Sequence, residues 1–211
     1  MSTRIKICGI TRMEDGLAAA RAGADAIGLV FAEKSSRRVT PDQARAIAVA
    51  LPPFVSTVAL FVNAGPEEVE RIIHRVRPDC LQFHGEESPE YCSAFGLPWL
   101  KAARVRPGLD LLQFAARFEG AQGLLLDAYS PAAHGGTGER FDWGLIPAVM
   151  PRPVVLAGGL VPANVGEAVH VARPWAVDVS SGVEAAPGIK DAAKIAAFVK
   201  EVKDADAEFG Y

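Results

Sequence analysis

The segment RIKICGIT at residues 4–11 decides which fold the rest of the chain suggests. Its isoleucines alternate with a lysine and a cysteine, which is the period of a β-strand, and Gly9 ends the run. Thr11 and Glu14 then predict a capping box at the start of a helix. A strand that leads into a helix through a tight turn is the first half of a βαβ unit. The segment therefore predicts a parallel α/β fold.

The same unit is repeated along the chain. After Gly23, which closes the first predicted helix, seven more apolar runs have the length and composition of buried strands. They occupy residues 26–31, 57–62, 80–84, 100–105, 124–127, 154–157 and 176–179. The intervening predicted helices include one beginning at Thr40-Pro41, one at 67–77, one from Ser88-Pro89 to Gly96, and a final one at 191–202.

Eight strand and helix alternations, without a linker or a shift in composition, predict one domain over residues 1–211. They favour an α/β fold of the closed (β/α)8 type, a TIM barrel. An open doubly wound sheet would need fewer strands. Because no GxGxxG motif follows the first strand, a dinucleotide-binding site has little support.

Composition narrows the class of partner. Half of the 211 residues are apolar and the net charge is -3. The lysines and arginines are scattered, which argues against nucleic acid and favours a small-molecule substrate. No run reaches the roughly 18 apolar residues that a membrane helix needs, and the amino terminus lacks the apolar core of a signal peptide. We therefore expect no membrane partner.

The cysteines and histidines show no metal-site pattern. Cys8, Cys80 and Cys92 are odd in number and form no CxxC pair. The sequence has neither an HExxH motif nor a carboxylate cluster. It therefore predicts no disulfide framework, no metal, and a reducing, cytoplasmic environment.

Small residues follow the last two predicted strands. Gly158-Gly159 come after the seventh strand, and Ser180-Ser181-Gly182 come after the eighth. In (β/α)8 barrels these loops commonly hold a phosphate, because exposed backbone N–H groups point there. Either group alone is more typical of a turn, but together they predict a phosphate-binding site.

Two groups at strand ends could transfer protons. Cys8 ends the first strand and Asp127 ends the sixth, so the barrel would place both at the same rim. A lone cysteine can equally be a small buried hydrophobe, and a lone strand-end aspartate can cap a turn. Asp178 is the second candidate for the acid. Its alternative role is a structural ion pair with Lys101.

Other polar residues at the same rim are candidate substrate contacts. Arg37 follows the second strand and could form a two-pronged hydrogen bond to a carboxylate, although an arginine in a polar loop can simply be solvated; Arg38 is the less favoured neighbour. Gln82 and His84 alternate on one face of the fourth strand. We predict substrate contacts for Arg37, Gln82, His84 and Asp178.

Taken in order, these motifs resemble those of the phosphoribosylanthranilate isomerase family, along nearly the whole chain. The similar segments are residues 6–11, 28–31, 34–37, 81–85, 125–127, 135–138, 157–160, 164–165 and 177–184. One departure is Glu33, where the family often has proline before Lys34-Ser35.

The resemblance implies an Amadori rearrangement of a phosphorylated aminosugar in tryptophan biosynthesis, without cofactor or metal. It implies that Cys8 is the general base, that Asp127 is the general acid, and that Arg37 holds the anthranilate carboxylate. For Cys8 to act, the following helix or a nearby cation would have to lower the pKa of its thiol.

Three alternatives remain open at this stage. A related phosphate-binding barrel, such as a sugar-phosphate epimerase or indole-glycerol-phosphate synthase, would lack the pair formed by Cys8 and Asp127. A Schiff-base aldolase would use Lys101, and a non-catalytic sensor would bind the sugar phosphate without turnover. The sequence also leaves open whether the protein is a monomer or a homodimer, and whether it accepts the analogous histidine-pathway substrate.

Overall fold

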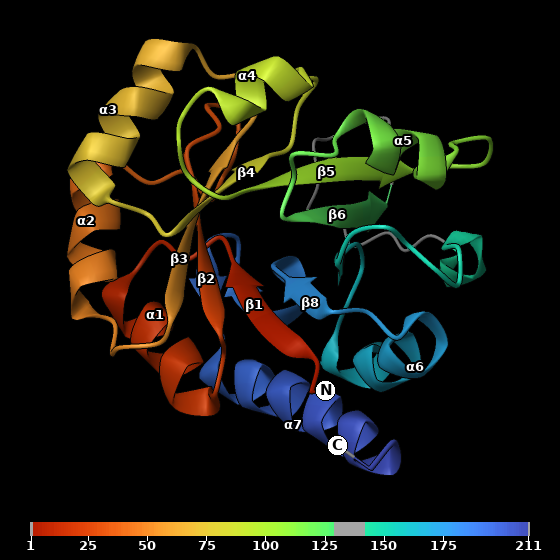
Figure 1. Ribbon diagram of the computed structural model, residues 1–211. Coiled ribbons are helices and arrows are strands. Elements are labelled where there is room, and N and C mark those ends of the chain that lie inside the picture. Colours follow the sequence, from red (N-terminus) through yellow and green to blue (C-terminus); the bar gives the residue numbers. More distant parts are fainter. Residues whose placement is uncertain (1, 129–141, 211) are drawn as a thin grey trace.

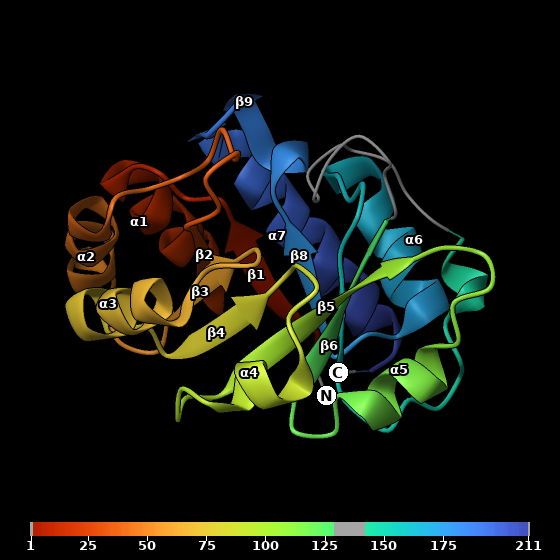
Figure 2. The same cartoon turned by 90° about the horizontal axis from the view of Figure 1, so that it is seen from above.

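A closed parallel barrel forms the centre of the molecule, which the computed structural model describes over residues 2–128 and 142–210. Each strand is hydrogen-bonded to the next in the sequence, and the eighth returns to the first (Figures 1 and 2). The strands are β1 (Arg4–Cys8), β2 (Ala26–Val30), β3 (Ser56–Phe61), β4 (Cys80–Phe83), β5 (Trp99–Val105), β6 (Gly123–Ala128), β7 (Val154–Leu156) and β8 (Ala176–Val179). The predicted fold and all eight predicted strands are confirmed.

Helices cover the outside of the barrel (Figure 1). They are α1 (Met13–Ala22), α2 (Pro41–Ala50), α3 (Pro66–Val76), α4 (Pro89–Ser93), α5 (Leu111–Arg117), α6 (Pro162–Ala172) and α7 (Ala192–Glu208). In the described part of the β6–β7 connection, residues 142–153, the helical element is the 3-10 turn η1 (Trp143–Leu145). A second 3-10 turn, η2 (Ser181–Val183), and a short antiparallel ribbon of β9 (Glu184–Ala186) and β10 (Ile189–Lys190) follow β8.

Two helix ends differ from the prediction. Helix α4 ends at Ser93, three residues before Gly96. Helix α7 continues to Glu208, because its last two turns still bury Ala205 and Asp206. The Asp206 carboxylate accepts hydrogen bonds from the backbone N–H and the hydroxyl of Thr3, each 2.7 Å long, so the two ends of the chain lie near each other (Figures 1 and 2).

Helix starts show where local sequence rules hold and where they are overridden. The Thr40 hydroxyl and the Gln43 side chain form a capping box on α2, at 3.2 and 2.9 Å. The box predicted from Thr11 and Glu14 is wrong, because the N-cap of α1 is Arg12. The Thr11 hydroxyl instead donates to the carbonyl of Gly188, in the turn of the β9–β10 ribbon. A distant segment binds the hydroxyl that the local motif would have used as an acceptor.

Side chains alternate between the two sides of the barrel wall, as the period of a strand requires. The main core lies between the strands and the helices and contains large residues such as Ile7, Leu29 and Phe83. The barrel interior holds a smaller apolar cluster, which includes Ala102 and Leu125, together with polar side chains. The outer layer therefore carries most of the apolar packing, and the interior is left for polar chemistry.

No helix within residues 2–128 and 142–210 is long and apolar enough to cross a membrane.

We predict that Phe83→Ala lowers the free energy of unfolding by about 3–5 kcal/mol, the usual cost of deleting a buried phenyl ring. Phe83 is fully buried, and its ring lies 5.8–6.4 Å, centroid to centroid, from those of four other aromatic residues. Urea unfolding at equilibrium measures the loss. Phe54→Ala is the matched control: Phe54 is fully exposed, so its loss should stay within about 0.5 kcal/mol. Equal losses in the two variants would contradict this account of the core.

Candidate functional site

A cavity of about 880 Å³ opens at the carboxyl end of the barrel strands. The predicted site residues that line it are Cys8, Arg37, Gln82, His84, Asp127, Gly158, Gly159, Asp178, Ser180 and Ser181. Closure of the barrel brings them together from six strand ends. The motif at residues 135–138 lies outside the described residues.

Gly182 is set back from this cavity, for a steric reason. A Cβ added at Gly182 would collide with the backbone oxygen of Leu160, in the loop after β7. Its role in the structure is therefore to let the loops after β7 and β8 approach each other. Ser180 and Ser181 are the residues of this loop that line the cavity, and phosphate binding by Gly182 stays a prediction.

Cys8 is buried at the end of β1, opposite Gly28 on β2. A Cβ at Gly28 would lie 2.6 Å from the Cys8 sulfur, so the glycine makes room for the thiol. Burial raises the pKa of Cys8 above its ordinary value of 9.0, although the cations of Lys6 and Lys190 act in the opposite direction. The expected neighbouring cations are present, but burial outweighs them, so the resting group is a thiol.

Lys6 precedes Cys8 by two residues and shares its side of β1. Its ammonium lies 2.9 Å from the Asp178 carboxylate, and both side chains are buried. The two residues are also register partners across the β1–β8 pairing. The alternative partner for Asp178, Lys101, is therefore wrong. The alternation of β1 places the side chains of Lys6 and Cys8 on the same face of the strand, so the sequence itself carries a signal for this neighbour.

Lys101 lies on the other side of the barrel wall, above the Phe118 ring. Its ammonium donates to the Gly85 carbonyl at 2.6 Å and pairs with the Glu87 carboxylate at 2.7 Å. Both side chains of this pair are almost completely buried. Lys101 is thus a charged structural group facing the helix layer, and the geometry does not support a Schiff-base aldolase.

Gln82, His84 and Asp127 form a chain of hydrogen bonds across the cavity floor. The Gln82 amide nitrogen lies 3.0 Å from His84 Nδ1, so this ring nitrogen is the acceptor. His84 Nε2 then carries the ring proton and donates it to Asp127 Oδ2 at 3.1 Å. Asp127 Oδ1 accepts from the backbone N–H of Ala128 at 2.9 Å. The chain fixes the carboxylate at the end of β6.

The loop after β7 adopts a conformation that favours glycine. Gly158 and Gly159 have φ angles of 82° and 64°. A Cβ on Gly158 would lie 2.5 Å from the backbone nitrogen of Ala128. The Asn164 side chain accepts from the Val161 N–H at 2.8 Å and donates to the Gly159 carbonyl at 2.9 Å, which fixes the loop. Both glycines expose backbone to the cavity, as a phosphate-binding loop requires.

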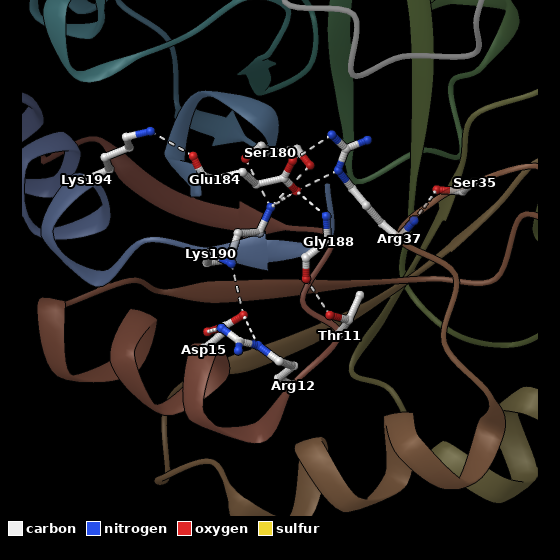
Figure 3. Close-up of polar contacts among 10 residues, drawn as sticks. All are labelled: Thr11, Arg12, Asp15, Ser35, Arg37, Ser180, Glu184, Gly188, Lys190 and Lys194. Carbon is white, nitrogen blue, oxygen red and sulfur yellow. Dashed lines mark hydrogen bonds and ion pairs between the residues drawn. The ribbon is translucent and has the colours of Figure 1, made fainter. Parts of the chain in front are cut away.

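Arg37 is held by an acidic residue that is not among the predicted site residues. Its Nε and Nη2 atoms lie 2.7 and 2.8 Å from the two carboxylate oxygens of Glu184, on β9 (Figure 3). Arg37 is therefore a fixed group, and the neighbouring Arg38 is exposed. Glu184 belongs to a three-residue strand and Lys190 to a two-residue strand, too short for a sequence pattern to reveal.

A second cavity, of about 460 Å³, lies at the opposite end of the barrel, with Thr3, Pro153 and Trp175 in its lining. These residues precede β1, β7 and β8. In (β/α)8 enzymes that end of the barrel serves stability, and the Asp206 carboxylate in this cavity is already taken by Thr3. The cavity beside Cys8 is the candidate active site.

We predict that alkylation of Cys8 by iodoacetamide accelerates about tenfold per pH unit between pH 7 and 9, because the thiolate is the reactive form and the pKa of Cys8 lies above 9.0. Lys6→Met removes a cation that lowers this pKa, so its Cys8 should react more slowly at each pH. Mass spectrometry of the Cys8 peptide measures both rates, and Cys8→Ser gives the background. A plateau below pH 9, or faster reaction in Lys6→Met, would contradict the account.

Comparison with known proteins shows which family the chain belongs to. The family described as N-(5'-phosphoribosyl)anthranilate (PRA) isomerase matches residues 5–201. The Pseudomonas putida N-(5'-phosphoribosyl)anthranilate isomerase is 59% identical over 204 residues, which cover 97% of this chain and 99% of the relative. The phosphoribosyl anthranilate isomerase from Thermus thermophilus superposes with a TM-score of 0.87 at 42% identity, covering 96% of this chain and 99% of the other.

A further solved phosphoribosyl anthranilate isomerase holds reduced 1-(o-carboxyphenylamino)-1-deoxyribulose 5-phosphate. It has a TM-score of 0.84 and 42% identity, with coverage of 96% of this chain and 99% of the other. With a family match over most of the barrel and relatives of this similarity, the chain belongs to the N-(5'-phosphoribosyl)anthranilate isomerase family of tryptophan-biosynthesis enzymes.

Proposed function

We propose that this isomerase converts N-(5'-phosphoribosyl)anthranilate into 1-(2-carboxyphenylamino)-1-deoxyribulose 5-phosphate, with Cys8 as general base and Asp127 as general acid. The observation that carries the assignment is that these two groups enter one cavity from β1 and β6, on different sides of the barrel mouth. The reduced product analogue held by the solved relative supports a phosphorylated, carboxylated ligand for such a barrel.

The proposed reaction is a sequence of proton transfers, and it begins when exchange with solvent moves one proton from the Cys8 thiol to the Asp127 carboxylate. Asp127 donates a proton to the furanose ring oxygen as the bond from that oxygen to C1 breaks, which gives an open-chain Schiff base. Cys8, as thiolate, removes the proton on C2, and the electron pair moves to give an enolamine. The C2 hydroxyl then loses its proton while C1 gains one, which gives the aminoketose. Substrate and product are isomers, and each step needs only a positioned acid or base.

The electrostatics near Cys8 fit its role as a base. Its thiol is neutral at rest, yet Lys6 and Lys190 stabilise the thiolate when the proton leaves. Asp127 is held by His84 and by the Ala128 N–H, so its carboxyl group keeps one orientation during ring opening. The two groups thus differ in surroundings as well as in chemistry.

We further propose that the two anionic ends of the substrate bind at different loops. The phosphate binds the backbone of Gly158, Gly159, Ser180 and Ser181, and the anthranilate carboxylate binds Arg37. Gln82, His84 and Asp178 line the floor between them and contact the sugar. The three cysteines are free, which fits a reducing cytoplasm.

We predict that Cys8→Ser and Asp127→Asn each lower kcat by about 10² to 10⁴, the usual value of one general acid or base. The assay is the loss of substrate anthranilate fluorescence after the protein is added. Both variants should still bind the reduced product analogue, because neither side chain is assigned to an anionic end. Near-normal turnover by Cys8→Ser, with Asp178→Asn inactive, would instead make the carboxylates the working pair.

A paired substitution tests the phosphate site. We predict that Gly159→Asp raises KM at least tenfold more than Gly159→Asn does. Both side chains meet the same φ of 64°, a region that Asp and Asn tolerate best among non-glycine residues, so the pair differs chiefly by one negative charge. Steady-state kinetics with the natural substrate measure the ratio. Equal KM values in the two folded variants would move the phosphate elsewhere.

A further inference from the structure

The carboxylate of Glu184 forms ion pairs with two cationic side chains, those of Arg37 and Lys190, and Arg37 lines the cavity (Figure 3). Its Oε1 atom accepts from Arg37 Nε at 2.7 Å and from Lys190 Nζ at 2.9 Å, and its Oε2 atom accepts from Arg37 Nη2 at 2.8 Å. All three side chains are mostly buried, with exposed fractions of 7% for Glu184, 15% for Arg37 and 0% for Lys190. This cluster is too well ordered to be an incidental surface pair.

The geometry divides the guanidinium of Arg37 into an occupied edge and an available one. Nε and one N–H of Nη2 form the side edge, which Glu184 fills with two nearly parallel hydrogen bonds. The end edge, formed by Nη1 and the second N–H of Nη2, has no partner among the described residues. A planar guanidinium can bind a second carboxylate in the same two-pronged way at that edge. Glu184 therefore leaves Arg37 one edge for a ligand.

The stem of Arg37 is confined as well. A Cβ on Gly9 would lie 2.5 Å from Arg37 Cδ, so the side chain passes closely over the end of β1. The carbonyl of Gly188, in the β9–β10 turn, accepts from the Thr11 hydroxyl, and the Gly188 N–H lies 3.3 Å from Glu184 Oε1. The ribbon that carries Glu184 is thereby fixed to the β1–α1 loop.

Lys190 extends the cluster to the proposed phosphate loop. Its ammonium donates to the Ser180 carbonyl at 3.0 Å and lies 3.4 Å from the Ser180 hydroxyl. Its backbone N–H donates to Asp15 on α1 at 3.0 Å (Figure 3). One carboxylate, that of Glu184, thus links the arginine at one anion site to the loop at the other.

The charge balance of the cluster suits an anionic ligand. Two cations share one carboxylate, so the group keeps one net positive charge in a buried setting, where charges are weakly screened. Burial raises the pKa of the Glu184 carboxyl, but the hydrogen bonds from Arg37 and Lys190 outweigh it, so the net shift is downward and Glu184 stays ionised.

We infer that Glu184 is a positioning residue that makes the isomerase selective for ligands carrying both a carboxylate and a phosphate at a fixed separation. It holds the end edge of the Arg37 guanidinium toward the cavity. Through its hydrogen bond with Lys190, it also fixes the position of Arg37 relative to the Ser180 loop. This inference rests on the proposed role of Arg37 in binding the substrate carboxylate.

The test compares two ligands by calorimetry: reduced 1-(2-carboxyphenylamino)-1-deoxyribulose 5-phosphate and the same compound without its carboxyl group. The measured quantity is the Kd of the carboxyl-free ligand divided by the Kd of the carboxylated ligand. This ratio reports only the affinity that the carboxylate adds. In the unmodified enzyme we expect a ratio of about ten to a hundred, as a charge-assisted two-pronged hydrogen bond gives. Arg37→Ala should bring the ratio to about one, while the carboxyl-free ligand keeps its affinity within about threefold.

Glu184→Gln keeps the shape of the side chain and removes its charge, so we expect the ratio to fall at least fivefold, with a similar fall in Glu184→Ala. Adding either change to Arg37→Ala should lower the ratio no further. Glu68→Gln is the matched control: it removes another carboxylate from the cavity lining, one on α3 that pairs with Arg71 rather than with Arg37, and it should leave the ratio unchanged.

The outcomes separate this inference from the proposed function. A ratio that survives Arg37→Ala would overturn the carboxylate-binding role of Arg37, and the inference with it. A ratio lost in Arg37→Ala but retained in both Glu184 variants would overturn the inference alone. Equal weakening of both ligands in the Glu184 variants leaves the ratio unchanged, so it would show that the ribbon only supports the fold.

Discussion

Pairing of β1 with β8 is the constraint on which the rest of this structure depends. It sets Lys6 opposite Asp178, residues separated by 172 positions in the chain, and it leaves the sheet without an edge. Because all eight strands are parallel, closure also gathers their carboxyl ends around one mouth. Cys8, Asp127 and the loops after β7 and β8 share a cavity for this reason alone. An open sheet of the same strands would spread these groups along its edge.

Buried ion pairs serve two purposes in this barrel. Lys101 and Glu87 lie on the helix side of the wall, and Glu87 also accepts from the Asn63 and Gly85 N–H groups, so the pair fixes the loops after β3 and β4. Such pairs add little net stability, because the cost of desolvation offsets their attraction. The pair of Lys6 and Asp178 has the same chemistry but faces the interior, where its cation also acts on Cys8. The side of the strand decides which purpose a pair serves.

Cys8 shows how opposing effects are balanced at the proposed site. Burial favours the neutral thiol, while Lys6 and Lys190 favour the thiolate. Lys6 pairs with the buried Asp178, and Lys190 pairs with the buried Glu184, which it shares with Arg37, so neither cation near the thiol lacks a carboxylate partner. Catalytic bases need a pKa that can be reached without a large energetic cost. The surrounding pairs let a buried thiol sit near two cations without destabilising the barrel.

The sequence by itself determined the barrel, because eight runs with the local pattern of a strand follow one another along the chain with helical segments between them. It also determined which strand ends carry Cys8, Asp127 and the Gly158-Gly159 loop, and the period of β1 already set Lys6 beside Cys8. Only the tertiary structure decided who pairs with whom: Asp178 with Lys6 rather than Lys101, Thr11 with Gly188 rather than its own helix, and Arg37 with Glu184. These partners come from segments far apart in the chain, and β9 and β10 are too short to leave a periodic pattern. Local rules describe what a segment can form, whereas closure of the barrel fixes which distant groups come within hydrogen-bond distance.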